Sequence, residues 1–252
     1  MEKSKRLRHV LLAGAAAALL AAAAGFLCAY LSGWIQFNQP SRERFPLRGV
    51  DVSSYQGDID WEALRRQGVS FAFIKATEGS GSQDLRFADN WQGATNASLY
   101  AGAYHFFSYD SPGETQADNY IGTVPRQAGT LPPVVDVEFY GDREKHPPGR
   151  SEVEPELKAL LNRLEEAYGV KPILYATGKA YTLFLQGDYE EYPLWIRNVL
   201  TEPSLPDGRG WTFWQYTDKG WLDGYRGKER FIDLNVFHGS EEELKALLIP
   251  EF

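Results

Sequence analysis

Cysteine and methionine are almost absent from this 252-residue chain, where each occurs once. The single cysteine, Cys28, lies in an apolar run near the N-terminus, so the rest of the chain can form neither a disulfide nor a cysteine nucleophile. The four histidines are scattered without metal-ligand spacing, and no serine stands in the sharp-turn motif of serine hydrolases. We therefore expect a domain that is stable through its core alone and uses no metal and no cofactor.

Positive charge is also scarce. The formal net charge is −8, and the first 31 residues hold four basic residues and one acidic residue, which leaves −11 on the remainder. A domain this acidic does not bind nucleic acid or an anionic membrane surface through charge. A polymeric ligand must therefore be held by hydrogen bonds and ring stacking, for which aromatic residues, 14% of the chain, are available.

Charged residues are missing altogether from residues 10–31, a run of 22 residues that is long enough to cross a bilayer as a helix. The basic residues within 1–9 predict that the N-terminus stays in the cytoplasm and that the remainder is exported. A cleaved signal peptide is the alternative, because Ala21–Ala24 offers small-residue cleavage sites, but the length of the run favours an uncleaved transmembrane anchor. Residues 32–47 then read as a linker, and residues 48–252 as one folded domain.

Eight short apolar runs recur after the linker and predict eight strands. They are Gly49–Ser53, Phe71–Thr77, Tyr100–Phe107, Pro133–Glu138, Pro172–Ala176, Pro193–Val199, Thr212–Tyr216 and Phe231–Phe237. Helical patterns lie between the early runs, at 60–67, 84–97, 113–122 and 154–168, and again at 240–248, but they fade after about residue 190. The 154–168 helix should start at Ser151 or Glu154 and stop at Gly169. Alternating strands and helices predict a parallel sheet, and eight strands predict an α/β barrel with five β/α units and three further strands.

The fourth run ends in two acidic residues, Asp136 and Glu138. On a strand these side chains face the same side, about 6.6 Å apart along the chain. Neighbouring carboxylates repel each other, and burial raises the pKa of at least one of them. Such an arrangement lowers the stability of the folded state. It is useful for catalysis, because one group stays protonated as an acid while the other stays charged. Taken alone, the pair could equally bind a metal or serve the structure.

Further polar residues lie at or near the ends of the other runs, where a parallel barrel places its chemistry. Asp51 and Asp233 belong to the first and eighth runs, which are neighbours in a closed barrel and lie opposite the fourth. They are therefore the natural carboxylates to face Asp136 and Glu138, unless the substrate supplies its own nucleophile. The candidate substrate-binding residues are Lys75, Tyr104, Tyr175, Trp195, Trp214 and Gln215. The aromatic ones, with Tyr216 and Phe107, could form the floor of a sugar-binding groove or simply belong to the core.

Taken in order, the runs resemble the glycoside hydrolase family 25 lysozymes of the Chalaropsis type. The resemblance is carried by the following segments: Gly49–Gly57 (GVDVSSYQG), Phe71–Gly79 (FAFIKATEG), Gly102–Phe106 (GAYHF), Asp136–Glu138 (DVE), Leu194–Ile196 (LWI), Trp214–Tyr216 (WQY) and Asp233–Phe237 (DLNVF). They span roughly residues 48–238. The resemblance implies a flattened, TIM-like (β/α)5(β)3 barrel that acts as an N-acetylmuramidase, hydrolysing the β-1,4 bond between N-acetylmuramic acid and N-acetylglucosamine in peptidoglycan.

The resemblance also implies roles for the acids. Glu138 matches the proton donor, and Asp136 matches the acid that orients the substrate's 2-acetamido group as an internal nucleophile. Asp51 and Asp233 match two further acids of the site. The expected partners are peptidoglycan glycan strands and, through the N-terminal helix, the membrane, with the catalytic domain acting as a monomer on its outer side.

Two segments depart from the family pattern. Family members often continue from the sixth strand's tryptophan with alanine and a bulky aromatic residue, whereas Trp195-Ile196 is followed here by Arg197-Asn198, and the charged segment Gly141–Arg150 also looks particular to this chain. Two other functions remain open: a catalytically silent glycan-binding domain, whose signature would be a lost acid, and a hydrolase of another N-acetylhexosamine polymer such as chitin.

Overall fold

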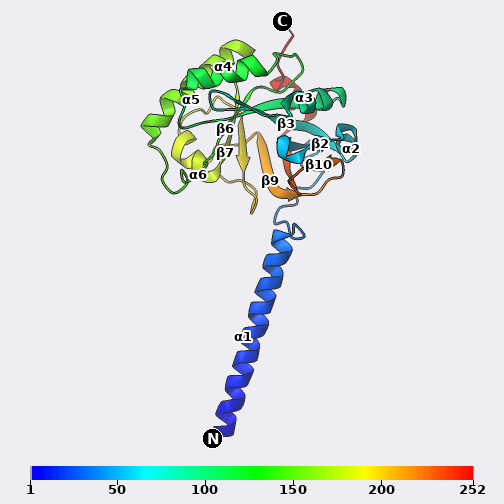
Figure 1. Ribbon diagram of the computed structural model, residues 1–252, viewed down its shortest axis with the longest axis vertical. Helices are drawn as coiled ribbons and strands as arrows, with labels where there is room; N and C mark the ends of the chain where they lie inside the picture. The colour runs from blue at the N-terminus through cyan, green and yellow to red at the C-terminus, as the bar shows by residue number, and fades with distance from the viewer. Residues whose placement is uncertain (1, 252) are drawn as a thin grey trace. The chain divides into compact units, whose positions relative to one another are not determined.

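The computed structural model describes residues 2–251 and contains two compact units, one ending at Phe37 and one beginning at Asn38. The first unit is built on a single helix, α1 (Glu2–Leu31), shown in Figure 1. Within it, Lys5–Leu31 has the length and the apolar composition of a membrane span, with a mean hydropathy of 2.3, although a signal sequence meets the same criterion.

Eight strands form a closed barrel in the second unit (Figure 1). Every run predicted to be a strand is one, and the barrel closes because the first strand pairs with both the second and the last. In chain order the strands are β1 (Arg48–Val52), β3 (Val69–Glu78), β5 (Tyr100–Phe106), β6 (Val134–Val137), β7 (Ile173–Thr177), β8 (Leu194–Arg197), β9 (Phe213–Gly220) and β11 (Ile232–Phe237). Three two-residue strands carry no signal in the sequence: β2 (Asp58–Ile59), β4 (Ser82–Gln83) and β10 (Tyr225–Arg226).

A helical segment follows each of the first five barrel strands, which confirms the predicted five β/α units. These segments are α2 (Trp61–Arg66) after the short turn η1 (Ser54–Gln56), α3 (Phe87–Asn96), α4 (Gly113–Thr123), α5 (Arg150–Tyr168), and α6 (Gly178–Ala180) continued by η2 (Tyr181–Leu185). Within residues 2–251, no helix lies between β8 and β11, and α7 (Glu241–Leu247) ends the fold. Helices α4 and α5 pack side by side on one flank of the barrel (Figure 1).

Helix α5 begins earlier than its sequence pattern indicates. It starts at Arg150 after the cap residue Gly149, rather than at Ser151 or Glu154, and it ends as predicted at Gly169, whose φ of 73° is the left-handed conformation that glycine tolerates. The first turn is mostly exposed and adds only Val153 to the buried stripe, so it leaves no apolar period in the sequence.

The direction of the last strand corrects the prediction of a parallel sheet. Strand β11 runs antiparallel to both of its neighbours, β9 and β1, while the other barrel strands pair in parallel. The chain passes from β9 to β11 through a loop without a crossover helix, and such a direct return produces an antiparallel pair. The beginning of β11, not its end, therefore lies at the rim where the other strands end. This places Asp233, the second residue of β11, directly opposite Asp51.

Alternation along the strands divides the core into an interior and an outer layer. Val134 points into the barrel interior among Phe71, Phe73 and Phe213, while Val135 and Val137 face the outer layer beneath the helices. The leucines of α5 fill that outer layer as their spacing predicts; they are Leu157, Leu160, Leu161 and Leu164. The same alternation turns Asp136 and Glu138 inward, at the end of the barrel where β6 stops.

Candidate active site

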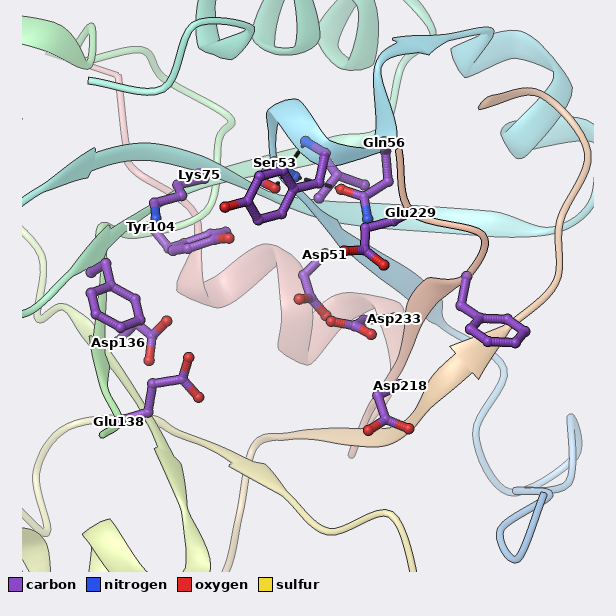
Figure 2. Close-up of a pocket in the computed structure, with 14 residues that line it drawn as sticks. Asp51, Ser53, Gln56, Lys75, Tyr104, Asp136, Glu138, Asp218, Glu229 and Asp233 are labelled. Atoms are coloured by element: carbon purple, nitrogen blue, oxygen red, sulfur yellow. Dashed lines mark hydrogen bonds between the residues drawn. The ribbon is translucent and has the colours of Figure 1, made fainter. Parts of the chain in front are cut away.

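A cavity of about 350 Å³ opens at this end of the barrel, and all four predicted acids line it (Figure 2). Asp136 and Glu138 lie together on one wall, and Asp51 and Asp233 lie together facing them. A smaller cavity of about 160 Å³, lined by the same four acids, continues into the barrel. The tertiary structure therefore brings together four carboxyl groups that are spread over 183 positions of the sequence.

Glu138 follows the last residue of β6, and its carboxyl group accepts no hydrogen bond from residues 2–251. Burial raises its pKa from 4.5 to about 6, against the opposing positive charges of Arg197 and Lys75. Asp136 is buried, and its Oδ1 has no hydrogen-bond partner in this part of the chain. Burial, and then the charge of Glu138, raises the pKa of Asp136 well above its ordinary value. Since neither carboxyl ionises easily beside the other, the pair retains a proton that belongs to both groups.

Asp51 and Asp233 form the second pair, and their surroundings differ. Asp51 accepts hydrogen bonds from the Nε2 of Gln215 (2.9 and 3.1 Å) and the Nδ2 of Asn235 (2.7 Å). Burial raises the pKa of Asp51, but these two amide donors oppose the rise. Burial and the neighbouring charge of Asp51 raise the pKa of Asp233 well above its ordinary value. The amide donors therefore favour the charged form of Asp51 more than that of Asp233, whose hydrogen bond from the Nε2 of Gln215 is longer (3.3 Å).

The two amides are oriented by aromatic donors beneath them. Tyr175 donates its hydroxyl hydrogen to Oε1 of Gln215 (2.9 Å), and Trp195 donates its indole N–H to Oδ1 of Asn235 (2.8 Å). With its carbonyl oxygen engaged in this way, each amide must turn its NH2 group towards the acids. Tyr175 and Trp195 line the inner cavity but are only 5% and 2% exposed, so they lie beneath the acids and offer little open surface to a sugar.

Of the remaining predicted binding residues, Tyr104, Lys75 and Gln215 line the cavities, but Trp214 does not. Phe213 lies in the barrel interior, so the next residue, Trp214, points outward, where it is buried against Phe45 and donates its indole N–H to the carbonyl oxygen of Asn198 (2.8 Å). Trp214 therefore does not line either cavity, and the structure does not bring it together with the other predicted site residues. Tyr216 and Phe107, the other groove candidates, are also buried outside the cavity.

Several cavity residues were not among the predicted binding residues. Arg197, noted above only as a departure from the family pattern, lines the inner cavity and forms an ion pair with Asp218 (2.7 Å). Tyr55 and Gln56 line the outer cavity. They belong to the GVDVSSYQG segment that carries the family resemblance, so the sequence could have indicated them as site residues. Glu229 reaches the same cavity from the β9–β11 loop (Figure 2), where nothing in the local sequence singles it out.

Histidine takes no part in the cavity. His105, near the end of β5, is fully buried and is hydrogen-bonded through its ring nitrogens to Thr77 (2.7 Å) and Gln116 (3.0 Å). Burial lowers its pKa to about 4, so it is a neutral structural residue at physiological pH. Among residues 2–251, no group of three or more His, Cys, Asp or Glu side chains is arranged to hold a metal ion.

Comparison with known proteins agrees with this architecture. Residues 50–225 match the sequence model of the glycosyl hydrolases family 25. A family 25 glycosyl hydrolase of known structure from Bacillus anthracis is 53% identical, with a TM-score of 0.79 over 84% of this chain and 97% of that one. Lysozyme M1 from Streptomyces globisporus is 34% identical over 80% of this chain and 71% of its own length, and the N,O-diacetylmuramidase from Chalaropsis sp is 30% identical over 80% and 98%. With a match that runs from β1 to β10, this chain belongs to glycosyl hydrolase family 25.

Proposed function

We propose that the cavity hydrolyses the β-1,4 bond between N-acetylmuramic acid and N-acetylglucosamine in peptidoglycan, with Glu138 as the proton donor. Family membership and the lysozyme and muramidase relatives make the chain a glycoside hydrolase that acts on peptidoglycan. The observation that carries the assignment of residues is that two pairs of buried carboxyl groups face each other across one cavity, where burial raises the pKa of every member.

Glu138 has the properties of a general acid. Its pKa of about 6 keeps it mostly protonated below pH 6 and about one tenth protonated at pH 7, and its carboxyl group faces the cavity without a hydrogen bond to the described residues. It can therefore give its proton to the glycosidic oxygen as the bond to the leaving sugar breaks. In the second half of the reaction, the same carboxylate takes a proton from the attacking water.

Asp136 is better placed to hold a nucleophile than to be one. It rises from the same wall as Glu138, so the two cannot approach an anomeric carbon from opposite faces. Its buried Oδ1 has no hydrogen-bond partner among residues 2–251 and could accept a hydrogen bond from the N–H of a 2-acetamido group. The acetamido carbonyl oxygen would then attack the anomeric carbon while Glu138 protonates the leaving oxygen, and water would open the resulting cyclic intermediate.

Substrate binding would also decide the position of the shared proton. An acetamido N–H donated to Asp136 favours the charged form of that carboxylate and so lowers its pKa. The proton of the pair then belongs to Glu138, which is where the leaving oxygen needs it. On the facing wall, the charged Asp51 would stabilise the positive charge that develops at the anomeric carbon.

An enzyme that acts on peptidoglycan works outside the cytoplasm. We infer that α1 is an uncleaved anchor that holds the domain at the outer side of the membrane, and that the domain acts as a monomer, because one chain supplies all the cavity residues described above. Mass measurement of the mature protein from membrane and soluble fractions tests the anchor: a soluble product lacking residues 1–24 would show a cleaved signal peptide instead.

Digestion of defined peptidoglycan with mass analysis of the products tests the reaction. New reducing ends on N-acetylmuramic acid are the expected result, and new ends on N-acetylglucosamine would show a glucosaminidase instead. Glu138→Gln should abolish product release while the protein stays folded. Binding without cleavage by the wild-type chain would favour a silent glycan-binding domain, and preferential cleavage of chitin would favour the other hydrolase; the presence of all four acids in the cavity argues against the silent domain.

A further inference from the structure

A second groove adjoins the catalytic cavity and has no role in the reaction described above. It encloses about 800 Å³ between strand β2 and the β9–β11 loop (residues 221–231), and Asp58, Asp60, Trp221, Asp223, Arg226 and Glu229 are among its lining residues; we call it the side groove. Its volume is within the roughly 300–1,000 Å³ of small-molecule sites. Glu229 lines both the side groove and the catalytic cavity, so the two lie next to each other.

Hydrogen bonds join the walls of the side groove to each other. Strands β2 and β10 pair across it, the backbone N–H of Asp60 donates to the carbonyl oxygen of Gly224 (2.6 Å), and the N–H of Glu229 donates to the carbonyl oxygen of Tyr55 (3.2 Å). The side chain of Gln67 forms two hydrogen bonds with the backbone of Asp223, donating to its carbonyl oxygen (2.7 Å) and accepting from its N–H (2.9 Å). A groove fixed in this way loses little conformational freedom when it binds a ligand.

Trp221 is the exposed aromatic residue of the side groove, with half of its surface open to solvent. Two neighbours contact the Trp221 ring. Phe231 packs edge-on against it with ring centres 5.6 Å apart, and the Arg230 guanidinium lies over it, 4.8 Å from the ring centre. Phe231 in turn lines the catalytic cavity. A glycan strand leaving that cavity would therefore pass Phe231 and Glu229 and reach a tryptophan that is already held in place.

The remaining lining residues select the ligand by charge. Four carboxylates line the groove, those of Asp58, Asp60, Asp223 and Glu229, against two arginines, Arg226 and Arg230. From outside the lining, Arg86 pairs with Asp58 (2.7 Å) and Arg66 with Asp60 (4.0 Å), so the groove carries no excess of positive charge that would attract nucleic acid or other polyanions. Carboxylates accept hydrogen bonds from hydroxyl groups, and an indole ring packs against the apolar face of a pyranose, so the combination suits an uncharged sugar.

We propose that the side groove is a glycan-binding subsite that stacks an N-acetylhexosamine residue on Trp221, beyond the two residues that flank the cleaved bond. This rests on the proposed function, because it takes the ligand of the catalytic cavity to be a peptidoglycan strand. The subsite gives the enzyme a preference for long strands over short ones, since only a long strand fills both cavities at once.

Comparison of strand lengths tests the subsite. The full-length chain and its Trp221→Ala variant are given a peptidoglycan tetrasaccharide and strands of eight or more sugars. The ratio of kcat/KM for long strands to that for the tetrasaccharide should fall about tenfold in the variant, as expected for the loss of one stacking contact. Trp221→Phe should recover part of the ratio, and Leu200→Ala, which removes an exposed apolar side chain that lines neither cavity, should keep it. An unchanged ratio in Trp221→Ala would overturn the proposal.

A binding measurement separates this proposal from the proposed function. Retention of the Glu138→Gln chain on insoluble peptidoglycan should weaken about tenfold when Trp221→Ala is added, whether or not the wild type cleaves the polymer. If the wild type cleaves the polymer but the Glu138→Gln chain is retained equally with and without Trp221→Ala, the subsite proposal alone is refuted. Weakened retention without any cleavage by the wild type would support the subsite and refute the reaction.

Discussion

Glu138→Gln should make the protein more stable at neutral pH while it removes activity. The structure gives the size of the effect: burial moves the Glu138 pKa from 4.5 to about 6, and each pKa unit corresponds to about 1.36 kcal/mol. The ionised side chain therefore costs at most about 2 kcal/mol at pH 7. Glutamine has nearly the same shape and no charge, and the substitution breaks no hydrogen bond to the described residues, so most of this cost should be recovered.

The stability gained by Glu138→Gln should increase with pH. Between pH 4.5 and 6 the folded state binds more protons at Glu138 than the unfolded state, so wild-type stability falls as pH rises through this range. The gain from Glu138→Gln should therefore be close to zero at pH 4 and approach about 2 kcal/mol at pH 7.

Urea unfolding of the full-length chain, followed by tryptophan fluorescence at pH 4, 5, 6 and 7, measures this gain. With a slope of about 3 kcal/mol per M, the midpoint at pH 7 should rise by about 0.7 M. Glu190→Gln, at an exposed glutamate, is the matched control and should stay within about 0.5 kcal/mol of the wild type at every pH. A gain of equal size at pH 4 and pH 7, or a loss at pH 7, would refute the electrostatic account of the site.

Three further predictions concern activity and its pH dependence. The kcat/KM of the wild type should fall as pH rises above about 6, because Glu138 must be protonated. Arg197→Met should move this fall to higher pH, because the Arg197 charge lowers the Glu138 pKa. An unchanged pH profile would show that Arg197 does not influence the Glu138 pKa. Asp136→Asn should reduce kcat on the order of 10³-fold if Asp136 orients the acetamido group, whereas a mild loss would point to another nucleophile. Tyr175→Phe, which removes the donor that orients Gln215, should lower kcat/KM about fivefold and stability by about 1 kcal/mol, and full activity would show that the amide is oriented by other contacts.

Local patterns predicted much of the fold because strands and helices leave a period in the sequence. The eight barrel strands and the helices after the first five are where apolar runs and helical spacing indicate them. The inward pairing of Asp136 and Glu138 follows from alternation on one short strand, which is also a local property. Strand β10 and the early start of α5 escaped prediction, because a two-residue strand and an exposed first turn bury too little to leave a pattern.

By itself, then, the sequence determined which segments form the barrel and which acids stand at its end. Only the tertiary structure decided that β11 runs antiparallel, which brings Asp233 opposite Asp51, and that Trp214 turns away from the site. It also placed beside Asp51 the two amide donors that favour its charged form, Gln215 and Asn235, which are 164 and 184 positions away in the chain. The physical reason is that a period is set by neighbours along the chain, whereas burial, pairing and pKa are set by neighbours in space.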